Sequence, residues 1–342
     1  MMRKRNLTVM LSLAALALVF SSVSSAADGW KPTRAVTIYC SSGAGGMTDL
    51  CNRALAAAFK DYFGVPFNVT NMVGGGGGTG VNHVYNLPRD GYSILGAADN
   101  LHGLGIRGAF NHPNTVWDVM LLTSAKGSIS VSSDSPYKTL DDLVQAIKKA
   151  EESGTLMKGG ASQAGCVWSV KMAQFNEVTD TKVNVLPYEG STKTIVALLS
   201  GEIDVILCGL AEQDDYVKAG KIRPLAMIEA DDYTHSTAGH IQSLAKYYPE
   251  FAKYKQAMQW GGIAFPVDTP KEIIDAYYKA FEYALTSKPV VDLATTRNVD
   301  VVGLYGEAGA KAIADNDSVF AWVIYESGLA VKSPEEFNIP RP

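Results

Sequence analysis

Beyond its first 26 residues, the sequence has little that would place it within a membrane or on nucleic acid. No later apolar run approaches the ~20 residues that a membrane-spanning helix needs. Lys and Arg number 30 against 35 Asp and Glu, and the formal net charge is −5. A basic surface for nucleic acid is therefore not expected. Internal repeats, low-complexity tracts and long linkers are also absent from the sequence.

The sequence also lacks the motifs of several enzyme classes. Neither of its two glycine-rich segments is followed by the lysine and serine of a P-loop. Residues 160–165 lack the G-x-S-x-G spacing of a nucleophile elbow, so Ser162 is expected to donate a hydrogen bond rather than to attack a substrate. Residues 75–80 satisfy G-x-G-x-x-G, but almost any stretch this rich in glycine does so. We therefore expect neither an enzyme nor a cofactor.

Histidine and cysteine are few. Only His235 and His240 of the five histidines are close, and their spacing fits no common zinc signature, so no metal site is predicted and surface or capping roles are expected. The four cysteines are Cys40, Cys51, Cys166 and Cys208. They allow three full disulfide pairings in an oxidising compartment, and the sequence does not choose between these and buried free thiols.

The N-terminus has the pattern of a secretory signal. Three cations at positions 3–5 precede an apolar stretch over residues 7–20, and small residues then lead to Ala26. Residues 1–26 are therefore predicted to be a cleaved signal peptide that directs the chain to export. A membrane anchor is the alternative, but the apolar stretch is shorter than the ~20 residues of a spanning helix.

Apolar runs that are typical of strands alternate with amphipathic helical patterns. Strands are expected at 67–73, 93–97, 129–132, 183–186, 203–207, 222–227 and 261–265. Clear helices are expected at 140–152 and 271–286, where apolar residues recur every three or four positions. Ser135-Pro136 and Thr269-Pro270 are the expected start signals of these helices. The alternation predicts an α/β fold with mainly parallel sheets and helices on both faces.

The length predicts two domains, at about 150 residues per domain. We expect domain 1 to be discontinuous, formed by residues 27–128 and 232–342, and domain 2 to be formed by residues 129–231. A ligand cleft is expected between the two domains, and the protein is expected to be a monomer.

Two glycine-rich loops follow apolar runs and precede helical patterns. The first loop is residues 41–49, SSGAGGMTD, and the second loop is residues 71–80, NMVGGGGGTG. Glycine can take positive φ and turn successive N–H groups toward one point, and a following helix adds partial positive charge. The two loops therefore indicate one shared site for an anion. Because neither loop contains a cation, backbone amides are expected to recognise it, and Gly46 is expected to permit their approach.

Five short motifs occur in order along the chain. They are G-G-M-T-D at 45–49, N-x-x-G-x-G-G-x-x-G at 71–80, P-R-D-G-Y-x-x-L at 88–95, P-Y-E-G at 187–190 and G-x-x-x-P-x-x-T-P at 262–270. In this order they resemble the signatures of the tripartite tricarboxylate transporter receptors, also called the Bug family of periplasmic solute-binding proteins. Arg89 is one extra residue in the third motif, and the similarity spans nearly the whole chain after the signal segment.

The resemblance implies a Venus-flytrap receptor of the type II periplasmic-binding class, which closes on a small organic acid such as a di- or tricarboxylate and delivers it to the membrane permease subunits of a tripartite transporter. The first loop would bind a ligand carboxylate through backbone amides and ordered water. The segment Asp99-Asn100 after the 93–97 strand would reach the same cleft. The ligand-binding residues implied are Ser42, Gly43, Gly45, Gly46, Thr48, Asp49, Asn100, Ser162, Gln163, Cys166 and Tyr188. For Asp49 a helix-capping role is preferred over direct contact with the ligand.

The sequence departs from the family pattern where the ligand would lie. Ser41 and Ser42 replace a usual proline and aromatic residue, Gln163 replaces a glycine, and Cys166 replaces a serine or threonine. Trp168 is expected in the core rather than in the cleft. The resemblance therefore does not identify the acid. A receptor that reports to a membrane sensor, and an enzyme acting on a carboxylate, are alternatives of other classes, and the enzyme would need a positioned base and nucleophile.

Overall fold

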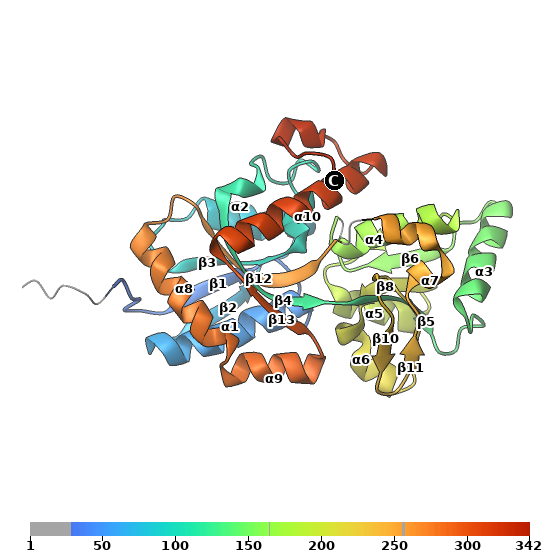
Figure 1. Cartoon of the computed structure of the whole chain (residues 1–342), viewed down its shortest axis with the longest axis horizontal. Coiled ribbons are helices and arrows are strands. Elements are labelled where there is room, and N and C mark those ends of the chain that lie inside the picture. The colour runs from blue at the N-terminus through green and yellow to red at the C-terminus, as the bar shows by residue number, and fades with distance from the viewer. Residues whose placement is uncertain (1–28, 164, 255–256) are drawn as a thin grey trace, which may run out of the picture. The chain divides into compact units, whose positions relative to one another are not determined.

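The computed structural model of the chain describes residues 29–163, 165–254 and 257–342, so the predicted signal segment 1–26 lies outside the described residues. Residues Lys31–Pro342 form one compact unit. Within this unit the strands form a six-stranded sheet, a five-stranded sheet and a two-stranded hairpin (Figure 1). Over the described part of the chain, none of the helices combines the length and apolar character that a membrane crossing needs.

The six-stranded sheet has the order β13-β4-β12-β3-β1-β2. Its strands are β1 (Val36–Cys40), β2 (Phe67–Asn71), β3 (Ser93–Ala98), β4 (Trp117–Ala125), β12 (Gln259–Pro266) and β13 (Asp300–Leu304). The pairs of β1 with β2 and β3 are parallel, whereas β12 runs antiparallel to β3 and β4. Every residue of β12 is buried, so this central strand is covered on both faces.

Helices lie on both faces of this sheet (Figure 1). On one side are α1 (Met47–Phe63), α8 (Lys271–Leu285) and α9 (Lys288–Arg297), and on the other are α2 (Gly78–Tyr85) and α10 (Gly306–Glu326). Short 3-10 helices are η1 (Gly75–Gly77), η2 (Asp99–Gly103), η3 (Asn114–Val116) and η5 (Pro334–Phe337). We call this sheet and its helices the six-stranded lobe.

The five-stranded sheet has the order β7-β6-β8-β5-β9. Its strands are β5 (Gly127–Ser132), β6 (Lys158–Ala161), β7 (Asn184–Pro187), β8 (Val205–Gly209) and β9 (Ile222–Met227). Its helices are α3 (Leu140–Glu152), α4 (Val167–Thr179), α5 (Ser191–Ser200) and α6 (Leu210–Lys218). The hairpin β10 (Tyr233–His235) and β11 (Gly239–Ile241), with α7 (Leu244–Tyr247) and η4 (Pro249–Lys253), follows β9. We call this sheet and its helices the five-stranded lobe.

The predicted α/β fold with two sheets is confirmed, but the expectation of mainly parallel sheets was wrong. Pairs made by β1 with β2 and β3, and by β6 with β7 and β8, are parallel. Strand β5 is antiparallel to β8 and β9, and β4 is antiparallel to β12 and β13. In the six-stranded sheet β12 and β13 run opposite to the other four strands. In the five-stranded sheet β5 runs opposite to the other four, because it continues directly from β4 through Lys126 with no crossover helix that would bring the chain back in the same direction. The predicted domain boundaries stay a prediction.

Helix α3 shows how local sequence sets an element. Its N-cap is Thr139, whose side chain accepts a hydrogen bond from the backbone of Asp142, while the Asp142 carboxylate accepts from the backbone of Thr139. The start signal is therefore this capping box and not the predicted Ser135-Pro136. The expected apolar stripe is confirmed, because Leu140, Leu143, Val144 and Ile147 are all buried.

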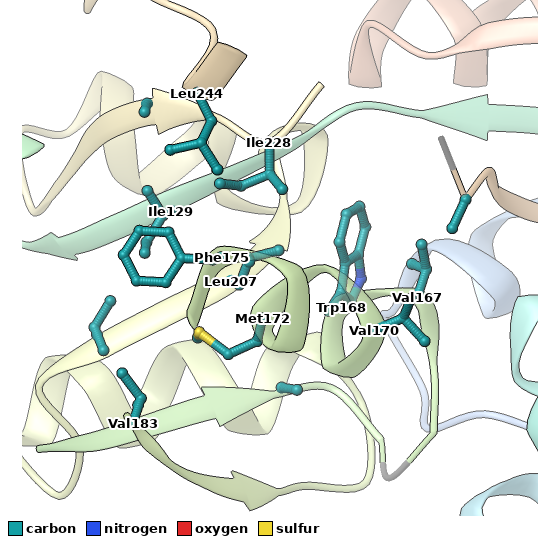
Figure 2. Packing of buried hydrophobic residues seen from close by; sticks show 14 of the residues in the cluster. Ile129, Val167, Trp168, Val170, Met172, Phe175, Val183, Leu207, Ile228 and Leu244 are labelled. Atoms are coloured by element: carbon teal, nitrogen blue, oxygen red, sulfur yellow. The ribbon is translucent and has the colours of Figure 1, made fainter. Parts of the chain in front are cut away.

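The body of α4 is fixed in a hydrophobic core. Trp168, Met172 and Phe175 point into a cluster with Ile129 and Leu207 of the five-stranded sheet (Figure 2). Trp168 is 3% exposed and belongs to the core as expected, but it also lines the cleft cavity described below, which was not expected. Residues of α10 also join this cluster, so the two lobes share buried apolar contacts. Because its body is packed in this way, α4 presents its first turn at a defined position.

Candidate ligand-binding cleft

The first loop connects β1 to α1, and Asp49 stabilises it from within. Gly45 has a left-handed φ of 79°, and its backbone N–H donates to the Asp49 carboxylate at 2.9 Å. Arg53 and Asn71 donate to the same carboxylate, at 3.0 and 2.9 Å. Burial alone would raise the pKa of Asp49, but these hydrogen bonds outweigh it and lower the pKa. Asp49 lies in the first turn of α1 and does not line the cavity described next.

A cavity of about 30 Å³ lies where the first loop meets the five-stranded lobe. The six-stranded lobe contributes Ser42, Gly46, Met47, Thr48, Ala98, Asp99 and Gln259, and the five-stranded lobe contributes Ser162, Gln163, Cys166, Trp168, Gly190, Ser191 and Glu212. The helices α1, α4 and α5 all begin at this cavity. Since a water molecule needs about 10 to 15 Å³, the cleft is closed, and an organic acid can enter only if the lobes separate.

The N-terminus of α1 binds a carboxylate of the protein itself. Glu212, in the first turn of α6, accepts a hydrogen bond from the backbone N–H of Met47 at 2.9 Å. Its other carboxylate oxygen accepts from the Cys208 thiol at 3.4 Å. Met47 is the first residue of α1, so its N–H has no acceptor within the helix and lies at the positive end of the helix dipole. The backbone of the first loop therefore forms an anion site.

At the N-terminus of α4 the roles of the lobes are reversed, because the helix belongs to the five-stranded lobe and the carboxylate to the six-stranded lobe. The backbone N–H of Val167 donates to the Asp99 carboxylate at 2.7 Å. Asp99 belongs to the six-stranded lobe and is 5% exposed. Burial raises the pKa of Asp99 to about 6, although the hydrogen bond from Val167 opposes this. Each lobe thus places one carboxylate on a helix N-terminus of the other lobe.

Gln163 adds polar contacts between the two lobes. Its side-chain nitrogen donates to the backbone carbonyl of Ser41, and its side-chain oxygen accepts from the Ser42 hydroxyl, both at 3.3 Å. Gln163 is 7% exposed, so its side chain is buried and does not project into solvent. It therefore lies across the cleft from the first loop.

Cys166 and Ser162 line the same wall. Cys166 is the residue before α4, and its sulfur lies 3.5 Å from the Ser162 hydroxyl oxygen. Burial, with a contribution from Asp99, raises the pKa of Cys166, so the thiol stays protonated and is a poor nucleophile. All four cysteines are free and buried. Within the described ranges, no group of three or more metal-ligating side chains comes together.

The structure brings together six of the predicted site residues and places five elsewhere. Ser42, Gly46, Thr48, Ser162, Gln163 and Cys166 line the cavity, whereas Gly43, Gly45, Asp49, Asn100 and Tyr188 do not. The Asn100 amide donates to the carbonyl of Gly76 at 3.0 Å, which fixes the second loop instead. The Tyr188 hydroxyl donates to Glu202 at 2.9 Å. Gly43 lies at the rim, against the backbone of residues 189 and 190.

The second loop does not share the anion site, so this expectation was wrong. The glycines at positions 74–77 take positive φ, but none of the glycines of this loop lines the cavity. A Cβ atom on Gly77 would lie 1.8 Å from the Asn100 amide nitrogen, and one on Gly80 would lie 3.0 Å from the carbonyl of Met72. The glycines of the second loop therefore allow close packing of the backbone rather than anion binding.

The resemblance implied that the segment Asp99-Asn100 reaches the cleft, and Asp99 does line the cavity, whereas Glu212 and Gln259 were missed as cavity residues. Glu212 lies in the first turn of the helix that directly follows the buried strand β8. An acidic residue in that position, at the carboxyl edge of a sheet, is the signal that would have marked it as a candidate.

A second hollow, of about 560 Å³, lies against α10 and the start of β4. Trp117, Ile313 and Phe337 are among its lining residues, all of which belong to the six-stranded lobe. Although it is much larger, it has no wall on the opposing lobe, so closure of the lobes cannot enclose a ligand there. The cleft is therefore the better candidate.

Two α/β lobes that close on a cleft lined by helix N-termini define the fold of a solute-binding protein. A sequence model described as tripartite tricarboxylate transporter family receptor matches residues 51–329, and the chain belongs to this family. This confirms the family that the motifs indicated, which is a family of receptors rather than of enzymes.

Individual proteins agree with this assignment. The chain is 25% identical to protein BugT of Bordetella pertussis over 332 residues, covering 96% of this chain and 100% of BugT. Among solved structures it is similar to R. palustris Rpa4515 with adipate, at 21% identity and a TM-score of 0.73 over 87% of this chain and 99% of that one. It is also similar to MatC (Rpa3494) from Rhodopseudomonas palustris with bound malate, at 19% identity and a TM-score of 0.71 over 84% and 99%. These structures show that the two-domain fold is shared.

Proposed function

We propose that the protein is a periplasmic receptor that captures a small carboxylate and delivers it to the membrane subunits of a tripartite permease. The observation that carries this proposal is the hydrogen bond from the Met47 backbone to the Glu212 carboxylate, because it identifies an amide at a helix N-terminus that binds a carboxylate. Family membership supports transport as the purpose of binding. Similar proteins with adipate and malate support an organic acid as the cargo.

Binding would proceed by opening of the lobes, entry of the acid and closure around it. Chain segments cross between the lobes at Lys126 and between β9 and β12, which makes these the expected hinges. In the open form the N–H of Met47 loses Glu212, and the ligand carboxylate takes its place. The hydrogen bonds that the Asp49 carboxylate accepts from Gly45 and Asn71 keep that N–H in position, so little ordering is required on binding.

The cellular setting follows from the N-terminus and the family. Residues 1–26 would act as the signal peptide and be removed on export, and the remaining chain would work as a monomer in the periplasm. There the receptor would meet the permease subunits and no nucleic acid.

A thermal-shift screen followed by calorimetry tests the proposal. Mono-, di- and tricarboxylates are compared with neutral sugars and with the methyl esters of the same acids. A ligand at 100 times its Kd should stabilise the folded protein by about 2.7 kcal/mol, and only free acids should do so. If sugars or esters stabilise the protein and no acid does, the proposal is wrong.

The substitution Met47→Pro tests the amide itself. Proline is tolerated at the first position of a helix, and Gly46 already has the extended backbone that a following proline requires, with φ −76° and ψ 167°. The variant therefore lacks the N–H while α1 can still form. Met47→Ala is the matched control, since it loses the same side chain and keeps the N–H. A hydrogen bond to a charged group contributes about 1.5 to 3 kcal/mol, so the proline variant should bind the acid at least tenfold more weakly than the alanine variant.

A further inference from the structure

The side chains that line the cleft give it a negative charge. Asp99 and Glu212 are the acidic residues among the described residues of the lining, which include no Lys, Arg or His. Arg107 packs against Gly165 but is not among the lining residues. A dicarboxylate that entered the closed cleft would face two further carboxylates at short range, which is unfavourable in a site of low dielectric constant.

The side chain of Gln259 adds a hydrogen-bond acceptor that has no donor partner among the described residues. It lines the cavity and is 5% exposed. Its side-chain nitrogen contacts the carbonyl of Trp260 at 3.4 Å, whereas its side-chain oxygen has no hydrogen-bond partner among the residues that the structure describes. A buried acceptor without a donor is costly, so a ligand that brings N–H groups would gain from meeting it. Asp99, Glu212 and Gln259 together make the cavity rich in acceptors.

The donor and the acceptor of the α1 site lie side by side. The Met47 N–H and the Glu212 carboxylate are separated by only 2.9 Å. When a ligand carboxylate replaces Glu212 at this N–H, Glu212 remains at the rim of the same site because α6 holds it there. An α-amino acid has its carboxylate and its ammonium group on one carbon atom, so it can occupy the N–H and pair with the displaced carboxylate at once.

We propose that the ligand of the cleft is an acid that also carries an ammonium group, with an α-amino acid as the simplest form. The helix N-termini bind its carboxylate, and Glu212, Asp99 and Gln259 accept hydrogen bonds from its ammonium group. This inference rests on the proposed function, since it concerns the same cleft and assumes that a carboxylate binds there.

Calorimetry with matched pairs tests the charge of the ligand. The pairs differ only in the amino group: L-aspartate and succinate, L-glutamate and glutarate, L-alanine and propionate, L-leucine and 4-methylpentanoate, L-phenylalanine and 3-phenylpropionate. In at least one pair the amino member should bind at least tenfold more tightly. If acids without the amino group bind as tightly or more tightly in every pair, the inference is wrong and the proposed function stands. If no acid of either kind binds, both are wrong.

The variant Glu212→Gln distinguishes the role of the charge from a loss of folding. Its amide oxygen can still accept from the Met47 N–H, so closure of the empty cleft is retained, and a melting curve of the ligand-free variant checks that it folds. The amino member of the best pair should bind at least fivefold more weakly, and its partner without the amino group should bind equally or more tightly. Glu152→Gln, at the exposed end of α3, is the control and should change neither affinity. A parallel loss for both members would overturn the inference.

Discussion

A Cβ atom on Gly43 would lie 2.0 Å from the backbone carbonyl oxygen of Glu189. Gly43 belongs to the first loop and Glu189 to the segment before α5, so this contact joins the two lobes. No L-amino acid with a side chain fits there unless the backbones separate. The absence of a side chain at position 43 is thus a requirement of closure and not of the fold of either lobe.

The substitution Gly43→Ala should therefore impair closure while both lobes remain folded. We expect a larger radius of gyration in solution scattering for the ligand-free variant and at least tenfold weaker binding of the best acid. Ala44→Ser, at an exposed position of the same loop, is the control. Unchanged scattering and unchanged affinity in Gly43→Ala would show that the cleft does not close as described.

Removal of the Gln163 side chain should loosen the closed form. Gln163→Ala loses the hydrogen bonds to Ser41 and Ser42, and each contributes about 0.5 to 1.5 kcal/mol. Scattering should show a more open ligand-free protein, and the range of acids bound should widen, because a side chain that lines the cavity is lost. The exposed Gln145→Ala on α3 is the control. An identical ligand profile and identical scattering would contradict this role.

Asp99 should make stability depend on pH in the mildly acidic range. Its pKa is raised from an ordinary value of 3.8 to about 6, mainly by burial, so its protonated form is favoured in the folded protein. Folding is therefore opposed increasingly as the pH rises from about 4 to 6, and the full cost is present above that range. Asp99→Asn removes the charge, and its amide oxygen can still accept from Val167.

Urea unfolding between pH 4 and pH 7.5 measures this effect. The difference in the free energy of unfolding between Asp99→Asn and the parent protein should move in favour of the variant by roughly 1 to 3 kcal/mol from pH 4 to pH 7. A difference that does not change with pH would mean that Asp99 is not buried in its charged form.

Asp49 should behave in the opposite way. Because hydrogen bonds lower its pKa, its contribution to stability is present above about pH 4 and is lost only as the pH falls further. Asp49→Asn should reduce the free energy of unfolding at pH 7 by about 1.5 to 3 kcal/mol, since its amide group cannot accept from Gly45, Arg53 and Asn71 together. Asp61→Asn, exposed on α1, is the control. Equal stabilities at pH 7 would exclude this role of Asp49.

Local periodicity predicted many of the elements but not how they pair. The bounds of β9 agree with the predicted strand 222–227, and α8 with the predicted helix 271–286 to within one residue. Strand β6 was missed because its sequence, KGGA, has neither alternation nor β-branched residues. The direction of β5 was also outside the reach of a local pattern, because its partners lie far away along the chain.

The site shows the same division. Glycine spacing and family motifs identified the first loop, because the glycines that leave its backbone amides accessible are close together in the sequence. Glu212 was not found, since it lies 165 residues from Met47 in the sequence and only the fold brings them together. The backbone conformation of the loop was not predicted either: Gly46 has a φ of −76°, and the left-handed residue of the loop is Gly45.

Glu212 and Asp99, each of which binds a helix N-terminus of the opposite lobe, affect the concentration of solute that the receptor needs for binding. Glu212 and Asp99 give the ligand-free protein a closed state of its own, so an incoming solute must compete with groups whose local concentration is fixed by the chain. The apparent Kd is then larger than the intrinsic one by the ratio of total protein to open protein. A solute that binds weakly and is present well below this apparent Kd leaves the receptor mostly empty. The fraction of time that the empty receptor spends open therefore determines the solute concentration at which uptake begins.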